Sequence, residues 1–214
     1  PYVGAGRNIE EAKEPFYYII NGYKIAFVNA TRAEKYILTP EATTKAGGVL
    51  RCYDPTTFIG VIEEAKKQSD FVVALVHWGK EDSSQLEQVQ LDTSKQYIIV
   101  GTHAHTLQGI DFYNDKVIAY NIGDFIFNHE TKDTGIFQIK MKFNKELEYY
   151  FIPCLEKDEY TNESSLDVVG RTHHIHRLSL FQFGTDDYYH WNTFRITNLK
   201  IEWVGTLPFR ERGT

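Results

Sequence analysis

Three histidines stand at positions from which they could bind a metal ion. His103 and His105 follow a short apolar run that ends at Gly101, and His77 closes a second apolar run just before Glu81. Imidazole is a common ligand of Zn, Fe, Mn and Ni. We therefore predict a divalent transition-metal site at His77, His103 and His105. The plainer alternatives are that His103 and His105 lie on a surface turn and that His77 caps a strand.

The two apolar runs indicate how the chain could position these side chains. Residues 71–77 and 98–100 are continuously apolar, which is typical of strands covered on both faces of a sheet. Gly101 is expected to let the chain turn sharply at the end of its strand. In extended backbone, His103 and His105 would project to the same face. We expect the three imidazoles to point into one cleft.

The rest of the pattern predicts alternating helices and strands. A helix is expected over 58–68, capped by Thr56 or Thr57, and a second one over about 84–97. With the two apolar strands they form two βα-type units of a layered α/β sheet. Asn21-Gly22 predicts a tight hairpin turn. Other elements are expected as a strand at 1–3, a helix at 9–13, and strands at 16–20, 24–29, 110–113, 117–122, 125–127, 137–143, 149–152, 178–183 and 193–204.

Other candidate residues receive ordinary interpretations. The polar stretch 30–55 is long for a loop and could border a binding site, but its cations are interpreted mainly as solvated loop charges. Cys52 is interpreted as a structural thiol rather than a nucleophile, because no His or acidic partner for it is identifiable. The two cysteines lack metal-binding spacing and leave one disulfide possible. The cations are Arg32, Lys35, Lys45 and Arg51, and the remaining histidines, interpreted as surface or hydrogen-bonded residues, are His129, His173, His174, His176 and His190.

Composition limits the function classes. The chain has 214 residues, 42% of them hydrophobic, with 14 tyrosines and 14 phenylalanines, which suits a globular fold rich in strands. Its net charge of -6 argues against a nucleic-acid partner, since that role usually needs a basic surface. No stretch reaches the roughly 20 apolar residues of a membrane span.

Three segments in this order resemble the CapA family of bacterial capsule proteins, which is tied to poly-γ-glutamate biosynthesis. They are His-Trp-Gly-Lys-Glu at 77–81, Val-Gly-Thr-His-Ala-His at 100–105 and Tyr-Asn-Ile-Gly-Asp-Phe-Ile-Phe at 120–127, and the segments at 3–8 and 22–27 agree. Such proteins resemble calcineurin-like metallophosphoesterases. The resemblance implies an α+β fold, a layered α/β/β/α sandwich that lacks its N-terminal strands here. It covers 1–142, and 143–214 is expected to be a β-rich extension packed on the same domain.

The resemblance also implies roles for the candidate residues. His77 and His103 would share one ion of a dinuclear Mn, Fe or Zn centre, and His105 would face the other. Glu81 would contact a ligand or the substrate rather than the ion. Asp124 stands where asparagine is more usual. The family's first ligands, an early Asp, a Gly-Asp pair and an Asn-His segment, would lie upstream of Pro1, so we expect an N-terminally truncated chain whose site is short of carboxylates and could lack metal.

The function expected from this resemblance is extracytoplasmic capsule or poly-γ-glutamate biosynthesis. The partner would be an anionic polymer or a phosphate-containing substrate. The alternatives are an active metal-dependent phosphoesterase and a non-catalytic polymer-binding module. Any membrane association would run through an upstream segment. Self-association is expected if the sheet edge at 1–3 is uncovered.

Overall fold

A six-stranded mixed sheet carries the predicted histidines. The computed structural model describes residues 1–32, 39–94, 97–113, 116–125, 127, 131–157, 160–163, 191–197 and 200–207. The sheet order is β2-β3-β5-β6-β8-β7, in which β3, β5, β6 and β8 run parallel and the outer strands are antiparallel to their neighbours. These strands are β2 Phe16–Ile20, β3 Tyr23–Thr31, β5 Phe71–Trp78, β6 Ile98–His103, β7 Ile110–Tyr113 and β8 Lys116–Ala119.

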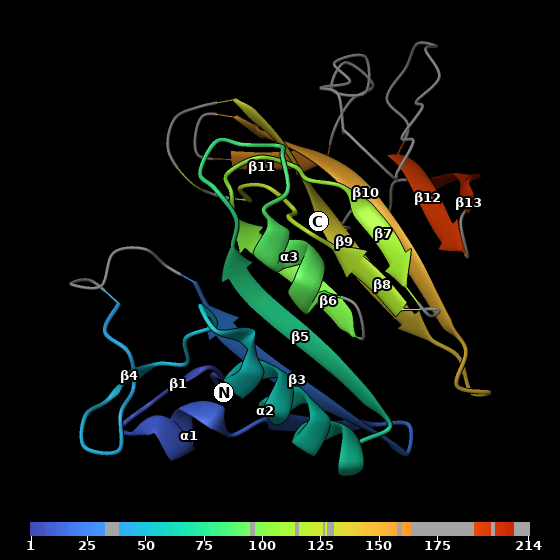
Figure 1. Cartoon of the computed structure of the whole chain (residues 1–214). Coiled ribbons are helices and arrows are strands. Elements are labelled where there is room, and N and C mark those ends of the chain that lie inside the picture. The colour runs from blue at the N-terminus through green and yellow to red at the C-terminus, as the bar shows by residue number, and fades with distance from the viewer. Residues whose placement is uncertain are drawn as a thin grey trace, which may run out of the picture.

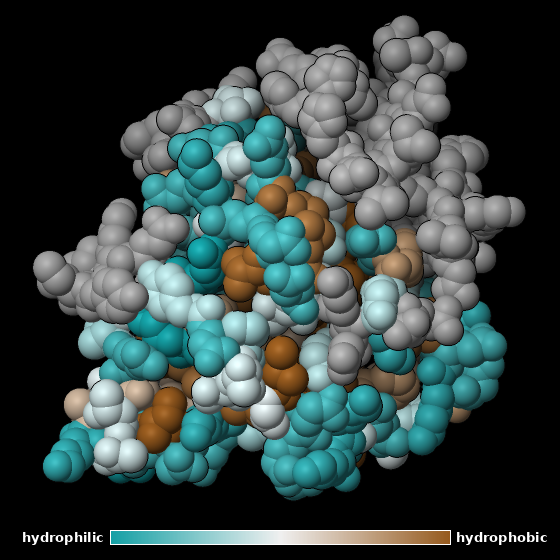
Figure 2. Space-filling view, in the orientation of Figure 1, coloured by the Kyte–Doolittle hydropathy of each residue, from teal (hydrophilic) through white to brown (hydrophobic). Residues whose placement is uncertain are grey.

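Two helices cover one face of this sheet (Figure 1). In α2, Pro55–Lys67, the buried side chains of Phe58 and Ile62 belong to the same core as Val28 and Val76 of the central strands. The short helix α3, Gln88–Thr93, lies over β6. In Figure 2, apolar atoms reach the surface around α3 in the middle of this face, bordered by polar side chains.

A second, antiparallel sheet packs on the opposite face. Tyr149 and Phe151 share a core with Ile98 and Val117 of the first sheet. The described residues therefore form helix, sheet and sheet layers, and the predicted layered α+β sandwich is confirmed in them. The second sheet consists of β9 Lys132–Met141, β10 Leu147–Lys157, β11 Tyr160–Glu163, β12 Trp191–Thr197 and β13 Lys200–Leu207.

A small third sheet and a short helix stand at the beginning of the chain. The pair is β1 Ala5–Gly6 with β4 Gly48–Val49, and α1, Ile9–Lys13, follows with the Asn8 side chain accepting from Glu11 N–H. The predicted helix is confirmed, but the strand predicted at 1–3 is wrong, because pairing with β4 begins only at Ala5. The expectation of self-association through that edge stays a prediction.

Several predicted boundaries need correction. Asp54, not a threonine, caps α2, and Pro55 is its first residue, a position that tolerates the missing N–H. The second helix is only Gln88–Thr93, because Glu87 and Gln90 close a capping box that fixes its start. The single strand expected over 193–204 is two strands, β12 and β13. The strand predicted at 178–183 lies outside the described residues, as do Lys35, His129, His173, His174, His176 and His190.

The hairpin prediction is confirmed. Ile20 pairs with Tyr23 across Asn21-Gly22, and both turn residues have positive φ. The expected boundary at 142/143 lies in the turn between β9 and β10, which are paired along their length. The division of the chain into 1–142 and 143–214 stays a prediction. No helix of the described residues has the length and hydropathy needed to cross a bilayer.

Gly101 allows close packing within β6 and does not form the predicted turn. It lies within β6, two residues before the strand ends at His103. A Cβ at this position would lie 1.9 Å from the carbonyl oxygen of Tyr120 and 2.4 Å from Nε1 of Trp78. That indole donates to the same carbonyl at 2.9 Å. Glycine is therefore needed for close packing of three chain segments, and the chain turns only after it.

Candidate metal centre

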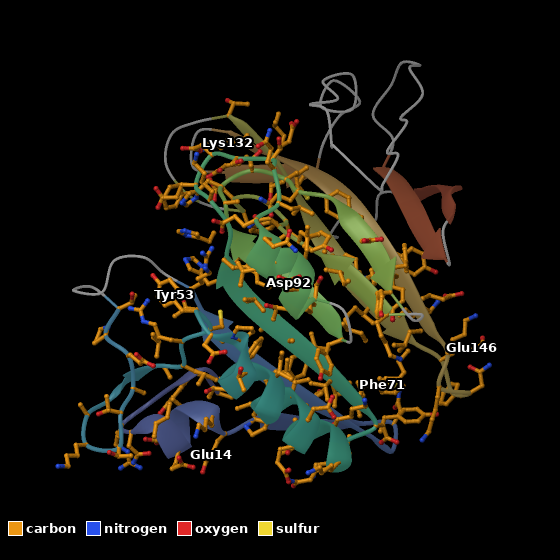
Figure 3. All side chains as sticks on the ribbon, in the orientation of Figure 1. Glu14, Tyr53, Phe71, Asp92, Lys132 and Glu146 are labelled. Carbon is orange, nitrogen blue, oxygen red and sulfur yellow. The ribbon has the colours of Figure 1, made fainter. Side chains whose placement is uncertain are left out.

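The candidate centre lies where the parallel strands end. Register places Thr31, His77 and Thr102 side by side on β3, β5 and β6, and His103 opposite Trp78. This carboxyl edge of a parallel sheet is where α/β proteins commonly bind ligands. Tyr53 and Lys132, both labelled in Figure 3, lie toward this same end of the sheet.

The three predicted histidines lie next to one another, but only His103 and His105 belong to the group whose ligand atoms could share one ion. The ring centroids of His77 and His103 are 4.4 Å apart, and those of His103 and His105 are 5.9 Å apart. His77 Nδ1 lies 3.3 Å from Thr102 Oγ1. Burial first, and then the neighbouring His103 and His105, lower the pKa of His77 to about 4, against an opposing effect of Glu81. His77 therefore stays neutral near pH 7, which is the form that can bind a metal.

The route to convergence differs from the predicted one. His103, the last residue of β6, has φ of 101° and His105 has φ of 54°, so both lie at positive φ and the backbone is not extended from His103 to His105. A non-glycine residue held there costs about 1–3 kcal/mol, and such strain concentrates at functional sites. The surrounding structure therefore holds both imidazoles in place at a cost in stability.

Glu81 completes the group. One ligand atom from each of Glu81, His103 and His105 lies within 4.8 Å of the others. The Asp82 N–H donates to the Ala104 carbonyl at 2.8 Å, which ties the loop carrying Glu81 to the histidine turn. The carboxylate, interpreted from the sequence as facing a ligand or substrate, is thus close enough to be a ligand itself. The assignment of individual residues to ions stays a prediction.

These donors fit a divalent ion. Two imidazoles and one carboxylate form a ligand set used by catalytic zinc and non-haem iron sites, which keep further positions open. His77 is the next donor beside this group. The compact group is sized for one ion, and the described residues show no second carboxylate within its 4.8 Å limit.

Sequence reasoning did not predict the contacts around His105. Its Nδ1 lies 2.7 Å from Asp124 Oδ1, and its ring stacks on Phe127 at 4.4 Å. Lys132 reaches Asp124 at 3.8 Å and Asp82 at 3.1 Å. The sequence signals were the resemblance at 120–127 and the position of Asp124 directly after Gly123, which has φ of 75° and permits the turn that aims the carboxylate.

The arginines of the 30–55 stretch were also misjudged. Arg51 is 5% exposed, and the Arg32 side chain is 22% exposed. Neither is a solvated loop charge, although Lys45 is exposed as predicted. Both cysteines are free and buried, so the disulfide left open by the sequence is absent.

Comparison with known sequences assigns the family. The profile described as bacterial capsule synthesis protein PGA_cap matches residues 1–129. The chain belongs to this family. It is 37% identical over 153 residues to the PGA biosynthesis protein CapA of Bacillus subtilis strain 168, which covers 66% of this chain and 39% of that protein. It is 32% identical over 157 residues to the capsule biosynthesis protein CapA of Bacillus anthracis, covering 67% of this chain and 37% of that protein.

The chain thus spans well under half the length of both curated relatives. Among solved structures, the Haemophilus influenzae NAD nucleotidase overlaps 76% of this chain and 29% of its own, with a TM-score of 0.34 and 11% identity. A hypothetical protein from Thermus thermophilus overlaps 71% of this chain and 62% of its own, with a TM-score of 0.36 and 11% identity. TM-scores and identities this low say nothing about activity.

Proposed function

We propose that this chain acts in the synthesis of an anionic capsule polymer of the poly-γ-glutamate type, through a divalent metal centre at Glu81, His77, His103 and His105. The observation that carries the proposal is the convergence of Glu81, His103 and His105, with His77 beside them, at the carboxyl edge of the sheet in a member of a capsule-synthesis family. Mn, Fe and Zn all suit imidazole and carboxylate ligands.

The chain's own residues would hold and orient the substrate. A bound ion would supply a Lewis acid for a carboxylate or phosphoryl oxygen. Glu81, in the loop after β5, and His103, at the end of β6, would provide ligands from two separate segments of the chain. Asp124 accepts from His105 Nδ1, which would leave Nε2 of that ring as the atom that could hold an ion. Phe127 stacks on one face of the same ring.

The place of action follows from the proposed polymer. Capsule polymers lie outside the cell, so we assign the chain to the extracytoplasmic side of the envelope. This rests on the two curated relatives named for capsule or PGA biosynthesis.

Metal-dependent phosphoester hydrolysis is the second candidate. The open coordination positions of a three-donor group favour it, since water and a phosphoryl oxygen could both enter. A dinuclear centre would need further carboxylates, and we expect this chain alone to hydrolyse p-nitrophenyl phosphate poorly. Robust turnover in Mn that His103→Ala abolishes would instead favour the enzyme.

The test combines binding with a cellular measurement. Isothermal titration of the metal-free chain with Mn or Zn should show one tight site that Glu81→Gln and His103→Ala weaken and Glu10→Gln, an exposed control on α1, leaves unchanged. In the organism that encodes the chain, His103→Ala in the gene should reduce cell-associated polymer. Unchanged polymer with normal protein levels would contradict the proposed function.

A further inference from the structure

A pair of arginines lies beside the candidate metal centre. Arg32 directly follows β3, and its backbone N–H donates to the His77 carbonyl at 2.8 Å. Arg51 forms a bridge with Thr31, the residue that stands next to His77 in the sheet register. Both arginines are therefore tied to the same carboxyl edge as the histidines. We call Arg32 and Arg51 the arginine pair.

The arginine pair shares one aromatic neighbour. The guanidinium carbons of Arg32 and Arg51 lie 5.8 Å and 5.6 Å from the ring centroid of Tyr53. Tyr53 itself is 37% exposed to solvent. Arg51 is almost fully buried behind this ring, while Arg32 keeps part of its side chain accessible. Tyr53 thus lies beside both guanidinium groups, and Arg32 is the one of the two arginines whose side chain keeps accessible surface.

The described contacts of Arg32 leave one of its donors without an acceptor. Its Nη1 pairs with Glu87, which also caps α3. Its Nε is buried and has no hydrogen-bond partner among the described residues. Arg51 donates through Nη2 to the Thr39 carbonyl, which fixes the orientation of its guanidinium group. The buried Arg51 adds its positive charge beside the more accessible Arg32. A buried guanidinium donor without a partner is costly unless an acceptor occupies it.

We infer that Arg32, with Arg51 and Tyr53 beside it, is a subsite for a carboxylate of the ligand whose neighbouring group lies at the metal centre. Guanidinium forks match planar carboxylates and phosphates. A polymer of glutamate presents one free carboxylate per unit, so one unit could occupy the metal while the next meets Arg32. This inference rests on the proposed function, and phosphate is the competing ligand of the same chemistry.

The test uses the full chain loaded with Mn. A γ-linked glutamate oligomer and inorganic phosphate are titrated separately into the wild type, Arg32→Gln, Arg32→Lys and Arg7→Gln. Arg7 is a matched control, since its side chain is 90% exposed and pairs with Glu11 on α1. Arg32→Gln should weaken the oligomer about tenfold, the usual effect of one charge-assisted hydrogen bond, and Arg32→Lys should lie between. Arg7→Gln should bind like the wild type.

The outcomes separate this inference from the proposed function. Mn affinity should be equal in all four proteins, which shows that the centre stays folded. If the oligomer binds the wild type and both Arg32 variants equally, the subsite is refuted and the capsule proposal stands. If only phosphate binds and Arg32→Gln weakens it, the subsite holds for an anion but the polymer is wrong. If neither ligand binds the wild type, both are overturned.

Discussion

Asp124 offers the sharpest perturbation of the candidate centre that leaves every proposed ligand in place. Its Oδ1 lies 2.7 Å from His105 Nδ1, and its side chain is 9% exposed. A hydrogen bond to a charged group contributes about 1.5–3 kcal/mol, and each 1.4 kcal/mol is a factor of about ten in affinity. Asp124→Ala should therefore weaken Mn or Zn binding by roughly 10–100-fold, as removal of such supporting carboxylates does elsewhere.

Two further variants separate hydrogen bonding from charge. Asp124→Asn keeps a neutral oxygen that can accept from His105, so its affinity should fall between those of the wild type and Asp124→Ala. Asp82→Asn is the matched control, because Asp82 contacts the same Lys132 at 3.1 Å without contacting His105 in any described hydrogen bond. Isothermal titration of each metal-free protein gives the affinities, and circular dichroism confirms folding. Wild-type affinity in a folded Asp124→Ala would refute the positioning role.

Three other predictions concern the fold around the site. In urea unfolding, Gly101→Ala should destabilise the chain by about 3 kcal/mol or more, because the added Cβ would overlap the Tyr120 carbonyl. Gly60→Ala, which has open space in α2, should instead stabilise the chain by up to about 1 kcal/mol. Similar effects of the two changes would contradict the packing argument. His103→Gly should be more stable than His103→Ala by about 1 kcal/mol, because glycine relieves the positive φ, and the reverse order would show that no strain is present. Burial raises the pKa of the Cys52 thiol from 9.0 to about 12, so in a variant without Cys154 the folded chain should resist thiol reagents near pH 8. Its free energy of unfolding should fall as pH rises above about 9, because the thiol of the unfolded chain ionises first. Rapid labelling of the native protein would contradict this.

Local sequence signals predicted much of the fold. The Asn21-Gly22 turn, the Asn8 cap and the apolar runs of β5 and β6 follow from rules that act within a few residues. Element boundaries were less predictable where two local signals competed, as at Asp54-Pro55, where the carboxylate and proline outweigh the following threonines. The short α3 likewise depends on a capping box that begins later than the periodicity suggests.

The site was predictable in its histidines and not in their setting. His77, His103 and His105 follow apolar runs, so their convergence could be inferred from strand ends. The left-handed turn at His103 could not, because no glycine or asparagine marks it. Asp124 and His105 are 19 residues apart in the sequence, and they meet only because the sheet places the segment after β8 beside the end of β6. The burial of Arg51 likewise depends on a distant contact, since Arg51 forms an isolated bridge with Thr31 at the end of β3.

The metal centre itself can be tested most directly by locating an ion. A crystal of the chain grown with Mn and measured at the Mn absorption edge gives an anomalous map that shows the ion and its ligands without any assay of activity. We predict one strong peak with Glu81, His103 and His105 at coordination distance and His77 beside it. A peak elsewhere would contradict the account. So would the absence of a peak at this group in crystals grown at an Mn concentration that saturates the chain in solution titrations.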